Sequence, residues 1–208
     1  MNEEIIYSVK NVTKQFPGVT ALNNVSMEIR RGEILAVIGE NGAGKSTLMN
    51  VLFGVYPPTK GELVFEGEQI LPFDPLKAQE KGIAMIHQEL SLAPALSVAE
   101  NIFVGRLPKN KIGMLDKGSL VRESKKLLEE VGLGEMDPWT LIRDINVSQQ
   151  QQVEIAKALS LNAKLLILDE PTSSLTVTEA EKLHEIMGHL KKRGITMLYI
   201  SHKLDEIM

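Results

Sequence analysis

The most informative part of the sequence is Val37-Ile-Gly-Glu-Asn-Gly-Ala-Gly-Lys-Ser-Thr47. An apolar run over residues 34–38 leads into it and predicts a short buried strand, and the residues after it predict a helix. Between strand and helix, Gly39 and Gly44 lie five positions apart, and a lysine and a serine come directly after the second glycine. This is the spacing of a loop that binds phosphate between a strand and a helix.

The residue types of this loop suit phosphate. Glycine adopts positive φ and lets backbone N–H groups approach phosphate oxygens closely, and a helix N-terminus adds partial positive charge. We expect Lys45 to reach the β- and γ-phosphates and the Ser46 hydroxyl to ligate Mg²⁺. The competing interpretation is a glycine-rich turn that binds nothing. The predicted nucleotide-phosphate site consists of Gly39, Asn41, Gly42, Ala43, Gly44, Lys45, Ser46 and Thr47.

Length and composition restrict the protein class. The 208 residues are enough for one domain with a substantial core, or for such a domain with an inserted lobe. The net charge of −4 gives no general attraction to nucleic acid, and the absence of cysteine excludes disulfides and thiolate metal sites. No apolar run approaches the length of a membrane span, and the N-terminus does not resemble a signal peptide. A role at a membrane would therefore require docking onto another protein there.

Strand and helix patterns alternate along the chain. Strands are predicted at residues 5–9, 25–29, 34–38, 62–65, 83–86, 165–169 and 195–200, and helices at 46–53, 75–81, 120–131 and 149–161, with further helices after the capping signatures Ser97-Val-Ala-Glu100 and Thr178-Glu-Ala-Glu181. The segment 14–18 is predicted to be a turn. The alternation favours an α/β fold with a doubly wound, mostly parallel sheet and a helical lobe inserted over about 91–162.

Four polar residues fall at the ends of predicted parallel strands, the edge where open sheets bind ligands. Asp169 and Glu170 follow the apolar strand 165–168; one carboxylate can hold Mg²⁺, and its neighbour can act as general base on the attacking water. Gln88 could ligate Mg²⁺ or orient the water, and His202 could contact the γ-phosphate. The alternative for each is a strand-end polar group that faces solvent.

Taken in order, these motifs resemble an ATP-binding cassette. The resemblance rests on the phosphate loop, Gln88, the segments 147–159 and 168–176, and the strand ending in Ser201-His202. It implies a P-loop NTPase core (1–90 and 163–208) with an antiparallel β subdomain near the N-terminus, and a helical subdomain (91–162). Finer features at 16–22, 85–90, 99–106 and 170–176 are similar to the ATPase subunits of bacterial monosaccharide importers, the galactose/methyl-galactoside type first and the ribose type second.

The resemblance implies a role for each motif, with ATP and Mg²⁺ as ligands. Phe16 would stack on adenine, whereas its sequence context alone favours a hydrophobic plug. Gln88 would link the Mg²⁺ site to the surface for the membrane subunit, Asp169 would bind Mg²⁺, Glu170 would be the catalytic base and His202 would sense the γ-phosphate. ATP would be bound between two cassettes, each offering its signature segment to the partner's phosphate loop. In this chain the signature residues are Asn146, Ser148 and Gln149.

Two positions depart from the family pattern. The signature usually begins Leu-Ser-Gly-Gly-Gln, whereas Ile145-Asn-Val-Ser-Gln149 has Asn146 in place of the serine. An amide can still donate hydrogen bonds, so we predict a half-site that still functions. Thr176 stands where many cassettes carry aspartate, and the usual contact across the dimer is therefore not predicted.

The resemblance implies an ATPase that drives uptake of a galactoside or ribose from the cytoplasmic face of the membrane. The implied partners are transmembrane permease subunits, a periplasmic or extracellular sugar-binding protein reached through the permease, and a second cassette. Because the chain stops soon after His202, we expect an N-terminal cassette of a longer polypeptide. One alternative is a soluble cassette acting on ribosomes or DNA, against which the acidic balance argues. Another is a phosphate-loop kinase or GTPase, but the guanine-reading motif Asn-Lys-x-Asp is absent.

Overall fold

The computed structural model describes residues 4–70 and 74–202, which form two compact units. The first unit comprises residues 1–85, 163–170 and 191–208, and the second comprises 86–162 and 171–190. The whole predicted helical subdomain, 91–162, lies in the second unit. Residues 171–190 also fall in that unit, so the grouping of 163–208 with the core stays a prediction.

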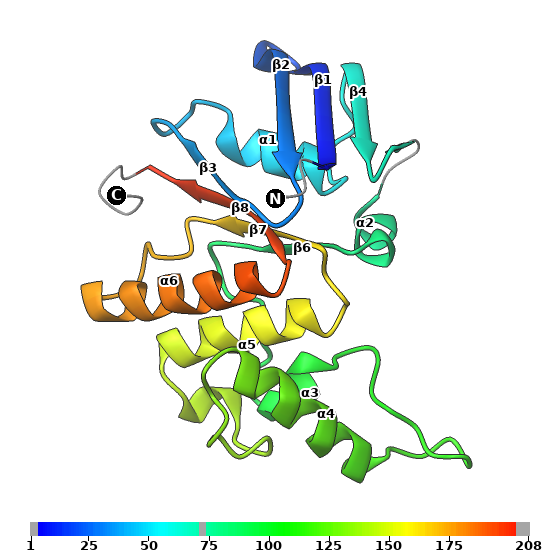
Figure 1. The fold of residues 1–208 in the computed structure, drawn as a ribbon, viewed down its shortest axis with the longest axis vertical. Helices are drawn as coiled ribbons and strands as arrows, with labels where there is room; N and C mark the ends of the chain where they lie inside the picture. Colours follow the sequence, from blue (N-terminus) through cyan, green and yellow to red (C-terminus); the bar gives the residue numbers. More distant parts are fainter. Residues whose placement is uncertain (1–3, 71–73, 203–208) are drawn as a thin grey trace. The chain divides into compact units, whose positions relative to one another are not determined.

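An antiparallel sheet in the first unit has the strand order β2-β1-β4-β5, and Figure 1 shows β2, β1 and β4 in that order. Its strands are β1 (Ile5–Phe16), β2 (Val19–Arg30), β4 (Lys60–Phe65) and β5 (Glu68–Gln69). The prediction of a turn over residues 14–18 is wrong at its start, because Lys14 and Gln15 pair with Leu22 and Thr20 on β2. Ladder hydrogen bonds extend both strands well beyond the apolar segments seen in the sequence, and the turn shrinks to Pro17-Gly18.

A second sheet has the order β3-β8-β7-β6 (Figure 1). Its strands are β3 (Ile34–Ile38), β6 (Ile83–Ile86), β7 (Leu165–Asp169) and β8 (Thr196–Ser201). β8 runs parallel to both of its neighbours, β3 and β7. All six residues of β8 are buried, as expected for a parallel strand covered on both faces. The predicted mostly parallel sheet and the antiparallel β subdomain are both confirmed.

One apolar core in the first unit combines side chains from both sheets and from α1 (Lys45–Leu52). Tyr7 lies within it, fully buried, and its hydroxyl donates to the carbonyl of Leu52 at 3.1 Å, at the C-terminal end of α1. Burial raises the pKa of the Tyr7 phenol, so it remains a protonated donor. The helix predicted at 75–81 is present as α2 (Pro75–Lys81) and is closed by Gly82; its N-cap, Asp74, was not predicted.

The second unit is helical. Its elements are α3 (Val98–Ile102), α4 (Lys117–Glu130), a 3₁₀ turn (Ile142–Asp144), α5 (Val147–Leu159) and most of α6 (Val177–Lys192). The helix predicted at 120–131 is present as α4, on which Leu120, Ser124 and Leu128 are buried. None of the helices in the described part of the chain is both long and apolar enough to cross a membrane.

Two capping predictions have different outcomes. Ser97 caps α3 and exchanges hydrogen bonds with Glu100, so that capping box is confirmed. The capping box predicted at Thr178 is wrong. α6 begins two residues earlier, with Thr176 as its cap: the Thr176 N–H and hydroxyl both donate to the Glu179 carboxylate, at 2.9 and 2.8 Å. Threonine and glutamate recur at the same spacing two positions apart, and the local pattern did not distinguish them.

Candidate active site

The loop between β3 and α1 has the geometry of an anion cradle. Gly42 and Gly44 both adopt positive φ, +83° and +91°, and Gly44 is the N-cap of α1 without any side-chain cap. A Cβ at Gly44 would lie 2.5 Å from the carbonyl oxygen of Ala21 on β2, so the loop packs directly against the β1–β2 hairpin. The first N–H groups of α1 have no partner within the helix and are available to a phosphate.

Lys45 lies inside this loop. It is 9% exposed, and its Nζ donates to the carbonyl oxygens of Gly39 and Glu40 at 2.7 and 3.0 Å. Its amine therefore sits where the loop closes on itself. Ser46, the next residue of α1, is exposed. The lysine charge and the serine hydroxyl are thus presented at the start of one helix.

The register of the parallel sheet brings the strand-end acid to the same edge as this loop. Asp169 pairs with Ile200 on β8, and Ile200 pairs with Val37 on β3, two residues before the loop. β8 alone separates β7 from β3, and neighbouring strands lie about 4.8 Å apart. Asp169 is therefore about two strand spacings from the loop, at the carboxyl ends of the strands, where open parallel sheets bind ligands.

Glu170 and His202 form a pair at this edge. The Glu170 N–H donates to the carbonyl of Ile200, and the backbone there adopts a φ of +45°, which is unusual for a residue other than glycine. Its Oε2 lies 3.1 Å from Nδ1 of His202, which directly follows β8. The Glu170 side chain is only 16% exposed. The side chains of two residues that were predicted at the ends of separate strands therefore lie side by side.

Phe16 belongs to a small cluster at the end of the β1–β2 hairpin. Its ring meets Tyr56 edge-on at a centroid distance of 5.3 Å, and Nζ of Lys14 lies 5.0 Å from its centroid. Lys14 also donates to the carbonyl of Pro57 at 2.8 Å. Phe16 is partly exposed and outside the buried core, which does not fit the hydrophobic plug.

Lys14 and Tyr56 were not identified from the sequence. The two-residue spacing of Lys14 and Phe16 along a strand puts both on one face, and this signal could have found the lysine. Tyr56 follows α1 and carries no local signal that connects it to the hairpin.

The other predicted residues belong to the second unit. Gln88 is exposed and lies two residues after β6. Asn146 caps α5: its Oδ1 accepts from the N–H of Gln149 at 2.9 Å, and Oε1 of Gln149 accepts from the N–H of Asn146 at 3.2 Å. Ser148 lies in the first turn of this helix.

This geometry gives a physical account of both departures from the family pattern. Asn146 replaces a serine and Thr176 replaces an aspartate, and each is the N-cap of a helix. Serine, threonine, asparagine and aspartate are the residues that cap helices best. Both substitutions therefore keep the helix start and change only the group that projects from it.

A sequence profile described as "ABC transporter" matches residues 22–173. The chain belongs to the ABC transporter family. This cassette is 48% identical over 206 residues to an Agrobacterium fabrum protein named as a ribose/galactose/methyl galactoside import ATP-binding protein. It is 46% identical over 207 residues to the ribose import ATP-binding protein RbsA of Rhodopirellula baltica. The matches cover 99% and 100% of the cassette but 40% of each relative, so the chain spans less than half of their length.

Solved structures share the cassette fold. An ATP-binding cassette of an ABC transporter in its ADP conformation superposes with a TM-score of 0.87 and 28% identity, over 98% of this chain and 83% of that one. The cassette cbiO1 from Clostridium perfringens, part of the transporter complex cbiONQ, gives a TM-score of 0.84 and 27% identity, over 99% and 81%. The predicted ABC ATPase fold is confirmed.

The residues at the sheet edge fit a nucleotide with Mg²⁺. Hard oxygen donors suit this ion, which binds to one or two protein ligands and to substrate phosphates. The cassette offers the Ser46 hydroxyl and the Asp169 carboxylate at one edge of the sheet. At Gly44 a side chain would collide with the carbonyl oxygen of Ala21, so glycine is needed there for the start of α1 to pack against the β1–β2 hairpin.

Proposed function

We propose that this cassette binds Mg–ATP, hydrolyses it and thereby drives uptake of a monosaccharide through a separate membrane permease. The observation that carries the ATPase part is the phosphate loop with Lys45 enclosed in it, at the sheet edge that also holds Asp169 and the Glu170–His202 pair. The names of the relatives support a sugar of the ribose, galactose or methyl galactoside kind.

Each side chain would have one task. Phe16 stacks on adenine, the residues from Gly39 to Thr47 bind the phosphates, and Ser46 and Asp169 hold Mg²⁺; Gln88 is a further Mg²⁺ ligand in this proposal. When bound, Mg²⁺ neutralises charge on the β- and γ-phosphates. Lys45 exchanges its loop carbonyls for phosphate oxygens and contributes positive charge where negative charge collects.

Glu170 would act as the general base. Nδ1 of His202 lies beside Oε2 of Glu170, which holds the carboxylate in one orientation and leaves Oε1 to accept a proton from the attacking water. Low exposure of the Glu170 side chain strengthens this interaction, because few competing waters surround it. The remaining ring nitrogen of His202 is then directed to the γ-phosphate.

The signature segment would act on a second cassette. Asn146, Ser148 and Gln149 lie at the N-terminus of α5, where the helix dipole favours an anion. In this proposal they contact the γ-phosphate bound by the partner cassette. The remaining partners are permease subunits, reached through the surface near Gln88, and a periplasmic or extracellular sugar-binding protein. With these partners, we propose that the cassette acts at the cytoplasmic face of the membrane.

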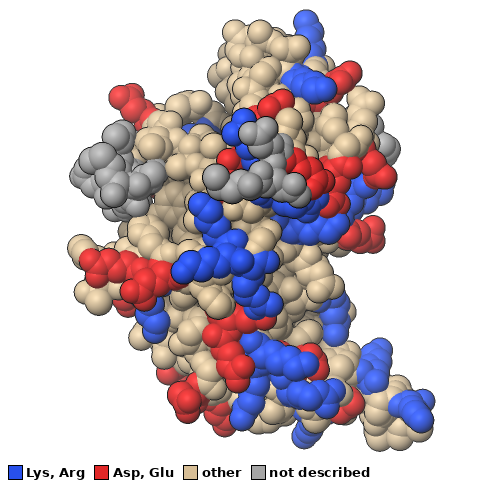
Figure 2. Space-filling model, in the orientation of Figure 1, with Lys and Arg blue, Asp and Glu red and all other residues tan. Residues whose placement is uncertain are grey.

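The alternative of a cassette that acts on ribosomes or DNA gains no support. The two relatives described above are named for sugar import. On the face shown in Figure 2, basic side chains are interspersed with acidic ones, and the net charge is −4. A large single-sign basic surface, which would attract nucleic acid, is not seen on that face.

Two substitutions test the proposal. Lys45→Ala removes the charge from the loop and is expected to lower ATP affinity at least about tenfold, measured by calorimetry. Glu170→Gln keeps the shape of the side chain but removes the base, so Mg–ATP still binds while turnover falls at least about 100-fold. Unchanged ATP affinity of the lysine variant, or undiminished hydrolysis by the glutamine variant, would contradict the assigned roles.

A further inference from the structure

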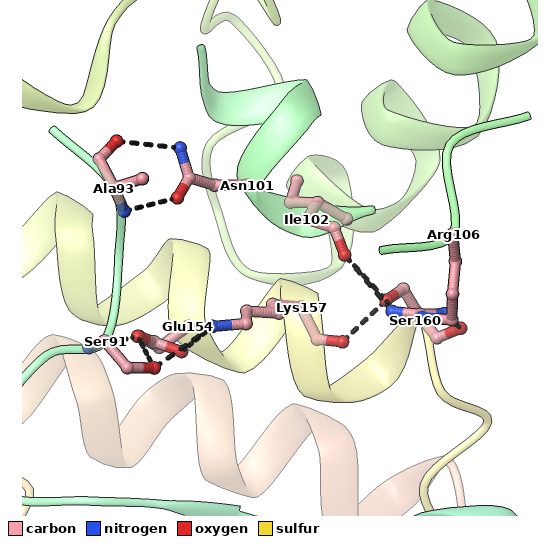
Figure 3. Close-up of polar contacts among 8 residues, drawn as sticks. All are labelled: Ser91, Ala93, Asn101, Ile102, Arg106, Glu154, Lys157 and Ser160. Atoms are coloured by element: carbon pink, nitrogen blue, oxygen red, sulfur yellow. Dashed lines mark hydrogen bonds and ion pairs between the residues drawn. The ribbon is translucent and has the colours of Figure 1, made fainter. Parts of the chain in front are cut away.

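Glu154 is a buried carboxylate on α5 that has no part in the nucleotide site described above. It is 6% exposed. Its Oε1 accepts hydrogen bonds from both the N–H and the hydroxyl of Ser91, at 2.7 and 2.8 Å (Figure 3). Its Oε2 lies 3.4 Å from Nζ of Lys157, and that amine also donates to the Ser91 hydroxyl oxygen at 3.1 Å. The three residues form a closed polar cluster between a loop and a helix.

Stability alone does not account for this cluster. Removing the Glu154 carboxylate from water is costly, and well-packed apolar residues often stabilise a fold as well as a buried charged group with its partners does. What charged hydrogen bonds add is a defined geometry. Here the hydrogen bonds of Glu154 fix the position of Ser91, a loop residue, relative to α5.

The same loop is fixed a second time, two residues further on. The N–H of Ala93 donates to Oδ1 of Asn101 on α3 at 2.7 Å, and Nδ2 of Asn101 donates back to the Ala93 carbonyl at 3.2 Å (Figure 3). Asn101 is 2% exposed. The loop that begins three residues after Gln88 is therefore hydrogen-bonded to two helices, α5 and α3.

α5 extends this connection to the signature segment. Its N-cap is Asn146, eight residues before Glu154, a distance of about 12 Å along the helix axis at 1.5 Å per residue. A hydrogen-bonded helix of this length is rigid compared with a loop. The hydrogen bonds to Glu154 thus connect Ser91, through α5, to the helix N-terminus that carries Asn146 and Gln149.

We propose that Ser91, Glu154 and Lys157 form a latch that couples the segment following Gln88 to the signature segment at the start of α5. Glu154 is a positioning residue: it touches neither nucleotide nor metal and acts through Ser91 and the helix. The inference rests on the proposed function, since Gln88 is there the link between the nucleotide site and the permease. The latch would connect Gln88 to the signature residues Asn146, Ser148 and Gln149, which complete the nucleotide site of the partner cassette.

A double-mutant cycle on the purified chain tests the latch. We expect kcat for ATP to fall about tenfold in Glu154→Ala and about threefold in Ser91→Ala, with no further loss in the double variant, because both remove one interaction. The Kd for ATP should stay within about twofold, since the phosphate loop is untouched. Ser91→Thr keeps the hydroxyl and should restore turnover. Glu154→Gln keeps the volume and an acceptor, and replaces the alanine variant if that variant does not fold.

Glu123 provides the matched control. It forms the same i,i+3 pair with Lys126 on the exposed surface of α4, and Glu123→Ala should leave kcat unchanged. Multiplied losses in the double variant, about 30-fold, would overturn the latch, and so would a lowered melting temperature with normal kcat. If the wild-type chain binds ATP but the kcat losses of the two single variants multiply in the double variant, the latch is refuted and the proposed function is not. A wild-type chain that binds no ATP overturns the proposed function, and the latch with it.

Discussion

Replacing Gly44 by alanine tests the close packing on which the phosphate loop depends. At a φ of +91°, an alanine is disfavoured by about 1–2 kcal/mol relative to glycine. The new Cβ would lie 2.5 Å from the carbonyl oxygen of Ala21 and 3.2 Å from Cδ2 of Leu22. Forcing a methyl group into such a space costs about 1–3 kcal/mol more. Gly44→Ala should therefore lower the free energy of unfolding by about 2–5 kcal/mol.

Alanine variants of two other glycines serve as controls. One separates the cost of backbone strain from that of the steric collision, and the other separates an effect on stability from an effect on ATP binding. Gly42 has a φ of +83°, but a methyl group added there would meet nothing within 4 Å, so Gly42→Ala should cost only about 1–2 kcal/mol. Gly61 on β4 has a φ of +92°, and its Cβ would lie 2.5 Å from the carbonyl oxygen of Asn11, far in sequence from the loop. Gly61→Ala should thus destabilise the protein as much as Gly44→Ala while leaving ATP affinity unchanged.

Urea unfolding gives the stability of each variant, and calorimetry gives its ATP affinity. In a chain of this size each kcal/mol lowers the melting temperature by about 2–4 °C, so the variants are separable by thermal unfolding as well. Equal stability of Gly44→Ala and Gly42→Ala would refute the collision with Ala21. Equal loss of ATP affinity in Gly44→Ala and Gly61→Ala would refute the loop-specific effect.

Two further predictions concern a helix cap and a partly exposed carboxylate that forms two ion pairs. Asn146→Ser should leave the free energy of unfolding within about 0.5 kcal/mol of wild type, because serine is also a good capping residue. Asn146→Ala, which has no capping group, should lower it by about 1 kcal/mol. Equal losses for the two variants in urea unfolding would contradict this prediction. For Glu66, burial raises the pKa, but hydrogen bonds from Lys164 and Arg31 outweigh it and hold the pKa below its ordinary range. The ionised Glu66 carboxylate therefore stabilises the fold fully above about pH 4.3, and this contribution is lost as the pH falls through the lowered pKa. The difference in the free energy of unfolding between wild type and Glu66→Gln should accordingly shrink towards about pH 3. A difference that does not change with pH would refute the stabilising role of the ionised carboxylate.

The phosphate loop was predictable because its information is local. The spacing of Gly39, Gly44 and Lys45 specifies the turn and the helix start within a few residues. The same holds for the strand β7, whose apolar run ends in Asp169, and for the cap Ser97 with its partner Glu100. Where two equally good local patterns compete, as at Thr176 and Thr178, sequence reasoning chose the wrong one.

Contacts between distant segments were not predictable in this way. Glu170 and His202 directly follow different strands, and only the β7–β8 register brings their side chains within 3.1 Å. Lys14 meets Tyr56 across 42 positions, and Ser91 meets Glu154 across 63. Each partner alone is an ordinary polar or aromatic residue, and no periodicity marks it.

The amino-acid sequence by itself determined the cassette fold, the phosphate loop and the residue types at the sheet edge. These depend on backbone conformation, helix caps and runs of apolar residues, which act over one or two turns of chain. Tertiary structure alone decided how the acid and the histidine pair, what surrounds Phe16 and how the loop after Gln88 is tied to α5. Those arrangements depend on strand register and side-chain packing. Such a contact contributes energy only after folding has brought its two residues, which are distant in sequence, close together.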